Sequence, residues 1–535
     1  MQQFSFRYKL TAVLFFLLFC LKGWSQTDTS RRIDILDGQS LRQLTIDSNT
    51  VLKTIAGNAI VRQGRTILSG DSIALNQLTG VAEVFGHVHI NDADSVHTYA
   101  NYLRYIGKER IAYLKRNVKL TDGKGILYTD DLEYNLATGI ATYKNGGRVV
   151  NGKTVLTSSD AVYYSDTKDV YFKKYVHLTD PKYDIVADSL LYNTQTKEAH
   201  FISPTRIKTK DGIINTKNGV YNLETGESTF YDRTSIVDST RSITGNYIFF
   251  DDKKGIALVE GNGKIVDSVS KVIVLGDRLE MNTKENSFLG TRKPIMIIYR
   301  NNDSTYITAD TLFSGLRKYD SSTRRTVIKN DTLNKVTELN VKTSATDSIR
   351  YFLGYHNVRI FNDSIQAVSD SMYYSTEDSV FRLFKDPVFW NAQTQVNGDT
   401  MYLFTQNQKP KRLYVFNNSM VINKANDAMF NQMSGRTLNG YFKDGEIDYI
   451  RMKGSPAESV FYPQDEDSAY IGMNRSKGDV IDIFFVKKEL NKVKFVNNVD
   501  GTLFPLRQVP ADQKYLKGFN WMDSRRPKTK LQMFE

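Results

Sequence analysis

The chain has 535 residues, a formal charge of +12 at pH 7 and one cysteine. This length exceeds what a single ordinary globular core supports, and a lone cysteine excludes a fold held together by disulfides. Tyrosine (31) and phenylalanine (29) are plentiful while proline (10) is scarce. This balance favours strands, because proline removes a hydrogen bond from a β-ladder.

The N-terminus has the pattern of a secretion signal. Arg7 and Lys9 precede an apolar run at residues 10–21. The run is shorter than the roughly 20 residues that a membrane-spanning helix needs. We therefore expect residues 1–25 to be a cleaved signal peptide, with a retained membrane anchor as the alternative. A polar, poorly ordered lead is expected at residues 26–40.

A short motif returns about every 30 residues and dominates the rest of the sequence. Its clearest copies are Ala187–Asn193 and Gly70–Asn76, in which a small residue, Asp and Ser precede alternating apolar positions and a final Asn. Its second position falls at Asp71, Asn101, Asp130, Asp160, Asp188, Lys217, Asn246, Asp277, Asp310, Asp370 and Asp399. The steps are 28–33 residues, apart from one of 370 − 310 = 60. So steady a period predicts a repeat architecture.

Each repeat reads as a strand, a tight turn and a second strand. Leu132 and Tyr134 lie two apart and share a strand face. The Asn and Gly of residues 135–139 then predict a hairpin turn. Because one apolar face needs a second sheet to cover it, we predict an all-β fold. Its expected form is an elongated two-sheet antiparallel β-jelly-roll or folded β-solenoid of ~30-residue repeats. Several separate β-sandwich domains are the alternative.

The repeats divide the chain into segments. We expect β-jelly-roll repeats at 41–315, a polar insert loop at 316–346, further β repeats at 347–500, and a C-terminal cap or basic tail at 501–535. In one repeat Gly219 occupies an apolar position. We expect a Gly219→Leu change to be tolerated there if the interior has room.

The sequence shows no motif for catalysis or cofactor binding. There is no nucleophile elbow, P-loop, dinucleotide fingerprint or zinc-ligand cluster, so we expect no enzyme, no cofactor and no metal site. The recurring Asp could bind calcium, but the Gly-Gly-x-Gly-x-Asp nonapeptide of calcium-binding β-rolls is absent. An Asp at a strand entrance more simply caps a turn through its side chain.

The apolar positions two and four places after this Asp form a column that runs through the repeats. In a closed fold the column is core, whereas in an open-sided fold it lines an apolar groove for acyl chains, and the sequence leaves both readings open. The groove candidates are Ile73, Leu75, Leu103, Tyr105, Leu132, Tyr134, Val162, Tyr164, Leu190, Tyr192, Ile248, Phe250, Leu279, Met281, Met372 and Tyr374.

The net charge of the chain indicates what kind of partner it binds. Residues 1–25 carry three basic side chains and no acidic one, so the mature chain is near 12 − 3 = +9. A basic excess favours an anionic partner. An anionic lipid, a glycolipid or a membrane face fits an exported protein better than nucleic acid does, and a merely solvated basic surface is the alternative.

The Asp-Ser strands, the Asn-x-x-Thr-Gly turns and the Gly-x-Val strands together resemble the OstA/LptA-like family of lipopolysaccharide-transport proteins. The chain looks most like the long OstA-like proteins of Bacteroidetes-type bacteria, over about residues 41–499. The resemblance implies a two-sheet β-jelly-roll whose apolar interior carries the acyl chains of lipopolysaccharide across the periplasm. It also implies members that join end to end through sheet edges.

From these patterns we expect non-catalytic binding and transfer of lipopolysaccharide, or a related anionic glycolipid, toward the outer membrane. The expected location is the periplasm, possibly in association with the outer membrane. Expected partners are inner- and outer-membrane transport components and possibly a second copy, paired through strand edges near residues 41–46, 480–486 and 493–499. The apolar segment 481–486 is expected to be covered by a partner or by the tail. A closed structural or adhesive β-solenoid of the envelope is the rival, and a polysaccharide-degrading solenoid is a third possibility.

Overall fold

The computed structural model describes residues 33–47, 50–76, 78–123, 125–300, 303–318, 348–406, 409–486 and 489–534. The predicted signal peptide and nearly all of the predicted insert lie outside these residues. The chain divides into two compact units, of which the first ends at Thr205 and the second begins at Arg206.

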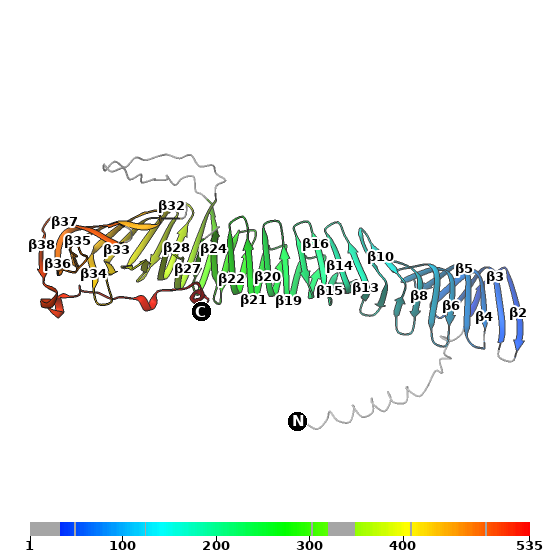
Figure 1. Cartoon of the computed structure of the whole chain (residues 1–535). Coiled ribbons are helices and arrows are strands. Elements are labelled where there is room, and N and C mark those ends of the chain that lie inside the picture. The colour runs from blue at the N-terminus through cyan, green and yellow to red at the C-terminus, as the bar shows by residue number, and fades with distance from the viewer. Residues whose placement is uncertain are drawn as a thin grey trace, which may run out of the picture. The chain divides into compact units, whose positions relative to one another are not determined.

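The first unit is made of antiparallel strands, most of which pair with the next strand in chain order, while some shorter ones pair with a strand two or three places away (Figure 1). They are β1 (Asp34–Asp37), β2 (Ser40–Asp47), β3 (Thr50–Gln63), β4 (Thr66–Asn76), β5 (Val81–Asp92), β6 (Val96–Ile106), β7 (Ile111–Thr121), β8 (Ile126–Asn135), β9 (Ile140–Tyr143), β10 (Gly147–Asn151), β11 (Thr154–Ser158), β12 (Asp160–Tyr164), β13 (Asp169–Thr179), β14 (Tyr183–Asn193) and β15 (Glu198–Phe201).

The second unit follows the same plan, which confirms the predicted all-β antiparallel class. Its strands are β16 (Thr205–Thr209), β17 (Ile213–Thr216), β18 (Asn218–Asn222), β19 (Glu227–Val237), β20 (Arg241–Asp251), β21 (Ile256–Asp267), β22 (Val272–Asn282), β23 (Ser287–Thr291), β24 (Ile295–Arg300), β25 (Asp303–Thr308), β26 (Thr311–Lys318), β27 (Ser348–Phe361), β28 (Ile365–Ser375), β29 (Val380–Phe384), β30 (Val388–Asn391), β31 (Thr394–Asn397), β32 (Thr400–Gln406), β33 (Lys409–Lys424), β34 (Phe430–Lys443), β35 (Glu446–Phe461), β36 (Met473–Val486), β37 (Glu489–Val496) and β38 (Asp500–Phe504). The 3₁₀ turns η2 (Leu506–Gln508), η3 (Ala511–Gln513), η4 (Asp523–Arg525) and η5 (Lys530–Met533) follow.

The hairpin turns form as the Asn and Gly pattern predicts. The Asn135 side-chain oxygen accepts hydrogen bonds from the backbone N–H groups of Ala137 and Thr138 at 3.0 and 3.1 Å. Gly139 then takes a φ of 66°, a left-handed conformation that glycine adopts at little cost. The same side-chain contacts occur at Asn76, Asn193, Asn222 and Asn282.

Many of the long strands turn a corner at two consecutive left-handed residues. In β7 these are Arg116 and Asn117, with φ of 64° and 55°, and the register with β8 shifts between Lys115 and Val118. Such a bulge bends a strand sharply. Equivalent steps occur at Gly86-His87, Lys174-Tyr175, Asp232-Arg233, Gly261-Asn262, His356-Asn357 and Asn417-Asn418.

The recurring Asp holds these corners. Asp130 accepts a 3.2 Å hydrogen bond from the N–H of Asn117, and Asp399 accepts one of 3.0 Å from the side chain of Asn418. In the second unit the N–H of Asn262 donates to its Asp in the same way, at 3.3 Å to Asp277. These Asp side chains therefore bond to the corner of the neighbouring strand, and Asp130 and Asp277 lie inside a strand rather than at its entrance.

The interior lies between the two halves of each bent strand. Leu413 and Val421 flank the Asn417-Asn418 corner of β33, and both belong to one buried apolar cluster with residues such as Met372 and Met452. In the first unit Val84 and Val88 flank the corner of β5, and both are buried. Each unit therefore closes its own core by folding its strands onto themselves.

The segment 505–534, here called the strap, crosses the outer face of the second unit (red in Figure 1). Gln395 donates its side-chain N–H to the carbonyl of Asn520 and accepts from the N–H of Met522, both at 2.8 Å. Gln432 repeats this pattern with Lys514 and Leu516, at 2.9 Å each. Leu516 is buried against β33, β35 and β36. The strap therefore packs on these strands through both hydrogen bonds and apolar contacts.

Two expectations are wrong. The predicted poorly ordered lead ends in a regular strand, because β1 pairs with β3. In segment 481–486, Ile481, Ile483 and Phe485 face the core instead of a partner or the strap. Strand β36 is paired on one side with β35 and on the other with β37 and β38.

Candidate functional site

The predicted apolar column is a continuous interior row in each unit. In the first unit Ile73 pairs with Val84, which pairs with Leu103, and the row continues through Leu114 to Leu132. The candidates that are at most 2% exposed are Ile73, Leu75, Leu103, Leu132, Leu190, Ile248, Leu279 and Met372. Partly buried candidates further along the same strands are Tyr105, Tyr192, Phe250, Met281 and Tyr374.

Two candidates face away from this row. Ala161 pairs with Phe172, which pairs with Leu190, so Val162 and Tyr164 lie on the outer face. The cause is a one-residue slip, because Asp160 aligns through Lys173 with Ser189 rather than with the Asp of that repeat. A slip of one residue reverses every side chain of a strand. The predicted groove residues Val162 and Tyr164 are therefore wrongly placed.

Large side chains fill the interior of the first unit near Tyr105 and Tyr134. Its second row alternates large and small residues, as Tyr105, Ala112, Tyr134 and Ala141 show, and burial raises the pKa of Tyr134. The hydroxyl of Tyr105 donates to Gln63 at 2.5 Å. An apolar hollow of only about 30 Å³ remains here.

The second unit holds a larger cavity of about 160 Å³. It is lined from one half of the fold by Ile265, Val274 and Met296, and from the other by Met281 and Met372. The strand halves therefore face each other across it. The apolar side chains of this lining suit part of an acyl chain.

Charged side chains stand at the edge of this cavity. Arg241 begins β20, two residues before the buried Ile243, and its cross-strand neighbour is Asp267. Arg350 lies in β27, two residues before Phe352 and therefore on the same face. Arg241, Asp267 and Arg350 all line the cavity. Arg241 and Arg350 belong to opposite halves of the bent strands, so each half contributes one cation.

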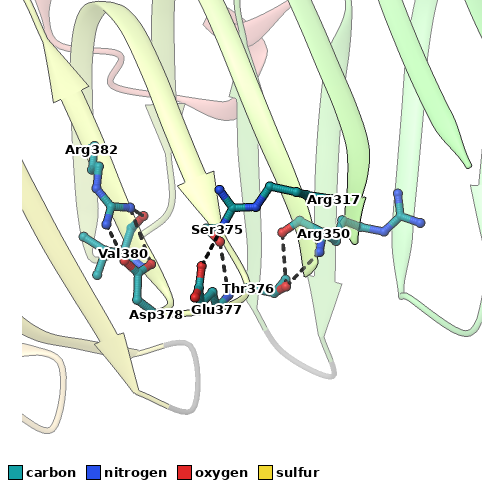
Figure 2. A network of polar contacts seen from close by, with 8 residues as sticks. All are labelled: Arg317, Arg350, Ser375, Thr376, Glu377, Asp378, Val380 and Arg382. Atoms are coloured by element: carbon teal, nitrogen blue, oxygen red, sulfur yellow. Dashed lines mark hydrogen bonds and ion pairs between the residues drawn. The ribbon is translucent and has the colours of Figure 1, made fainter. Parts of the chain in front are cut away.

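Arg350 is held in place by its own strand and by the next turn. Its backbone N–H donates to the hydroxyl of Thr376 at 3.1 Å, and its carbonyl accepts from the same residue. Figure 2 shows the guanidinium extending away from this turn, whereas Arg317 turns to Glu377. The Arg350 guanidinium donates to the hydroxyl of Ser314 at 3.1 Å. Burial lowers the pKa of Arg350, and the charge of Arg241 lowers it further.

Sequence reasoning missed both arginines of the cavity edge. A signal was present, because Arg350, Phe352 and Gly354 alternate in phase with the apolar column. A cation that continues an apolar column by two residues marks the end of the apolar interior. Arg241 and Ile243 show the same spacing.

The described residues give no indication of a metal site or a membrane-spanning helix. Within them no three His, Cys, Asp or Glu side chains gather closely enough to hold a metal ion. None of their helices is long and apolar enough to cross a membrane.

Comparison with known proteins supports the resemblance. Residues 31–188 match the model of a family described as OstA-like protein, which confirms the predicted family over that segment. Among curated proteins, none matches the chain.

Proposed function

We propose that this chain is a non-catalytic carrier in the periplasm that binds lipopolysaccharide or a related glycolipid and passes it toward the outer membrane. Its interior row is apolar in both units, as acyl chains require. The family match over residues 31–188 supports the same reading.

The observation that carries this proposal is the second-unit cavity. Its lining combines apolar side chains, such as Val274 and Met281, with uncharged polar residues and with Arg241, Asp267 and Arg350. An amphiphile needs both surroundings together, one for its chain and one for its head group. A closed structural solenoid has no use for an apolar cavity at a charged edge.

A photo-crosslinking experiment tests the proposal. A crosslinker at Met281 or Met372 should capture glycolipid in cells of the native host, because both residues line the cavity. The matched control is Tyr355, which is 45% exposed and adjoins the interior Gly354. Equal capture at Tyr355 and at the cavity positions would contradict an interior path.

The rival function, a closed structural or adhesive β-solenoid, draws support from the first unit. Its hollow of about 30 Å³ leaves little room for a ligand. Absence of capture at both cavity positions, in variants that retain the β-rich circular dichroism of the native chain, would favour this rival.

A further inference from the structure

We infer that the edge of the second-unit cavity is an anion subsite, where Arg241 and Arg350 together bind the phosphate of an amphiphile whose acyl chain occupies the cavity. This inference rests on the proposed function and names the chemistry that the site selects. It concerns the head group, whereas the proposed function depends only on the apolar interior.

The first support is the position of the two guanidinium groups. Arg241 lies two residues before Ile243 on the same strand face, and Ile243 pairs with Ile265 in the buried interior. Arg350 lies at the end of the facing row, beyond Phe352 and Gly354. A chain seated in the cavity would place its head group between the two cations.

The second support is that neither cation is held in an ion pair. Among the described residues, neither Arg241 nor Arg350 forms one, although Asp267 acts electrostatically on Arg350 and Asp238 acts on Arg241. The Asp267 carboxylate accepts hydrogen bonds from the N–H groups of Val269 and Ser270, at 3.0 and 2.8 Å, and so caps its own turn. Among the residues that line the cavity, two guanidiniums and one carboxylate leave a net charge of 2 − 1 = +1.

The third support is the contrast with arginines on the outer face of the same unit. Arg278 forms an ion pair with Glu260 at 2.6 Å, and Arg451 forms one with Asp482 at 2.8 Å. Arg382 likewise pairs with its neighbouring aspartate. These three arginines have a carboxylate partner, whereas the two at the cavity edge have none within the described part of the chain.

Phosphate is the anion that fits best. A guanidinium presents a fork of N–H donors that matches phosphate oxygens, and it stays charged even when partly buried. A phosphate monoester carries close to two negative charges at neutral pH, which would balance two guanidiniums and relieve their mutual repulsion. A neutral sugar head group would leave that repulsion in place.

Binding of three twelve-carbon probes tests the inference. Dodecyl phosphate, dodecanoate and dodecyl maltoside share a chain, and each is titrated into the purified chain below its critical micelle concentration. Arg350→Gln and Arg241→Gln should each raise the dissociation constant of dodecyl phosphate about tenfold, the loss expected for a charge-assisted hydrogen bond. The dissociation constant of dodecyl maltoside should stay within about twofold of its wild-type value in both variants. Wild-type chain should prefer dodecyl phosphate to dodecanoate.

The matched control is Arg317→Gln. Arg317 lies on the adjacent strand, faces the other way and pairs with Glu377, so this change should spare all three probes. Thermal unfolding of each variant shows whether the fold is intact. Equal weakening of the phosphate and maltoside probes by Arg350→Gln would overturn the anion subsite, as would no weakening of dodecyl phosphate.

A fourth variant separates failure of this inference from failure of the proposed function. Met372→Trp places a larger side chain in the cavity wall and should weaken all three probes. If Met372→Trp has no effect, acyl chains do not bind in the cavity and the proposed function of this unit falls. If it weakens all probes while Arg350→Gln spares dodecyl phosphate, only the anion subsite falls.

Discussion

Asp130 and its equivalents show how one side chain shapes a repeat. Each corner needs two left-handed residues, a conformation that most residues adopt only at a cost. The carboxylate accepts hydrogen bonds from the corner, as Asp399 does from Asn418, and so offsets part of that cost. At one corner Asp370 accepts from Ser371, His356 and Lys385, and these contacts lower its pKa.

Gly219 gives a residue-scale prediction that reverses the expectation from sequence. A Cβ at this position would lie 2.7 Å from the carbonyl oxygen of Thr229 and 2.8 Å from the ring of Phe230. Gly219→Ala should therefore destabilise the chain by about 2 kcal/mol through overpacking, and Gly219→Leu by more. Chemical denaturation measures the change.

The control for this prediction is Gly440, also on an interior strand. A Cβ there meets its nearest neighbour at 3.7 Å, an ordinary contact. Gly440→Ala should be neutral or slightly stabilising, because alanine lowers the entropy of the unfolded chain. Equal destabilisation by the two changes would contradict the space argument.

The ionisation of Asp482 should make the free energy of unfolding depend on pH. Burial alone would raise its pKa, but hydrogen bonds from Arg451 and Tyr449 outweigh burial and lower it. Because the folded pKa is depressed, this stabilisation is present above the unfolded pKa of about 3.9 and is lost as the pH falls through the folded pKa. Asp482→Asn should cost about 2 kcal/mol at neutral pH.

The measurement is the free energy of unfolding of wild type and Asp482→Asn across acidic pH. The gap between the two chains should narrow below about pH 4. A gap that stays constant from neutral pH to pH 2 would show that the charge of Asp482 does not stabilise the fold.

The strap is the main feature at the scale of elements. Gln366, Gln395 and Gln432 belong to one row of the outer face, separated by Trp390 and Ile422. All three glutamines are at most 5% exposed. Their amides satisfy strap groups that have left water, which matters because an unpaired buried polar group costs about 1–3 kcal/mol.

We expect Gln432→Met to release part of the strap. The change keeps the length of the side chain but leaves the carbonyl of Lys514 and the N–H of Leu516 without this partner. Backbone hydrogen exchange at residues 511–522 should become faster, while exchange in β28 stays slow. Gln508→Met, at an exposed strap residue, is the control, and unchanged exchange in Gln432→Met would show that packing alone holds the strap.

The edge strand β2 gives the second element-scale prediction. It pairs only with β3 among the described strands, and Leu44 and Ile46 are 62% and 58% exposed. An exposed apolar edge is a template for another strand. If β2 is a docking edge, as we propose, a Leu44→Lys and Ile46→Lys double variant should lose most of its association with a transport component or a second copy.

The control for this edge is Leu78→Lys, since Leu78 is an exposed apolar residue in a turn. Pull-down from cells of the native host, or light scattering for self-association, provides the readout. Undiminished association of the β2 variant would exclude this edge as the docking surface.

At the scale of the whole molecule, both units present an apolar row, and the cavity of about 160 Å³ lies in the second unit. If the first unit also carries glycolipid, a crosslinker at Tyr163 should capture it, because Tyr163 aligns with Val170 and Tyr192 on the interior face. Tyr164, one residue away and facing outward, should not. Capture at both positions, or at Tyr164 alone, would contradict an interior path through this unit.

The repeat, its turns and its capping aspartates could be predicted because each depends on residues close in sequence. Asn135 and Gly139 form a turn whatever lies around them. The slip at Asp160 could not be predicted, since β11 ends at Ser158 and β12 begins at Asp160, and the side that each residue takes follows from pairing with β13. A regular spacing of about 30 residues conceals a shift of one.

The strap and the cavity edge depend on partners far apart in the chain. Gln395 and Met522 are 127 residues apart, and in the sequence Gln395 is an ordinary polar strand residue. Arg241 and Arg350 likewise meet only because the strand halves fold toward each other. No local pattern fixes such pairs.

The order of the chain gives the strap a role in how the protein reaches its folded state. Every strand that it covers is synthesised before residues 505–534. Until then Trp390, Ile422 and Val460, all fully buried in the finished protein, lie uncovered on a newly formed sheet. Uncovered apolar surface of this kind favours aggregation, so the nascent second unit is the stage at which a chaperone would be needed most.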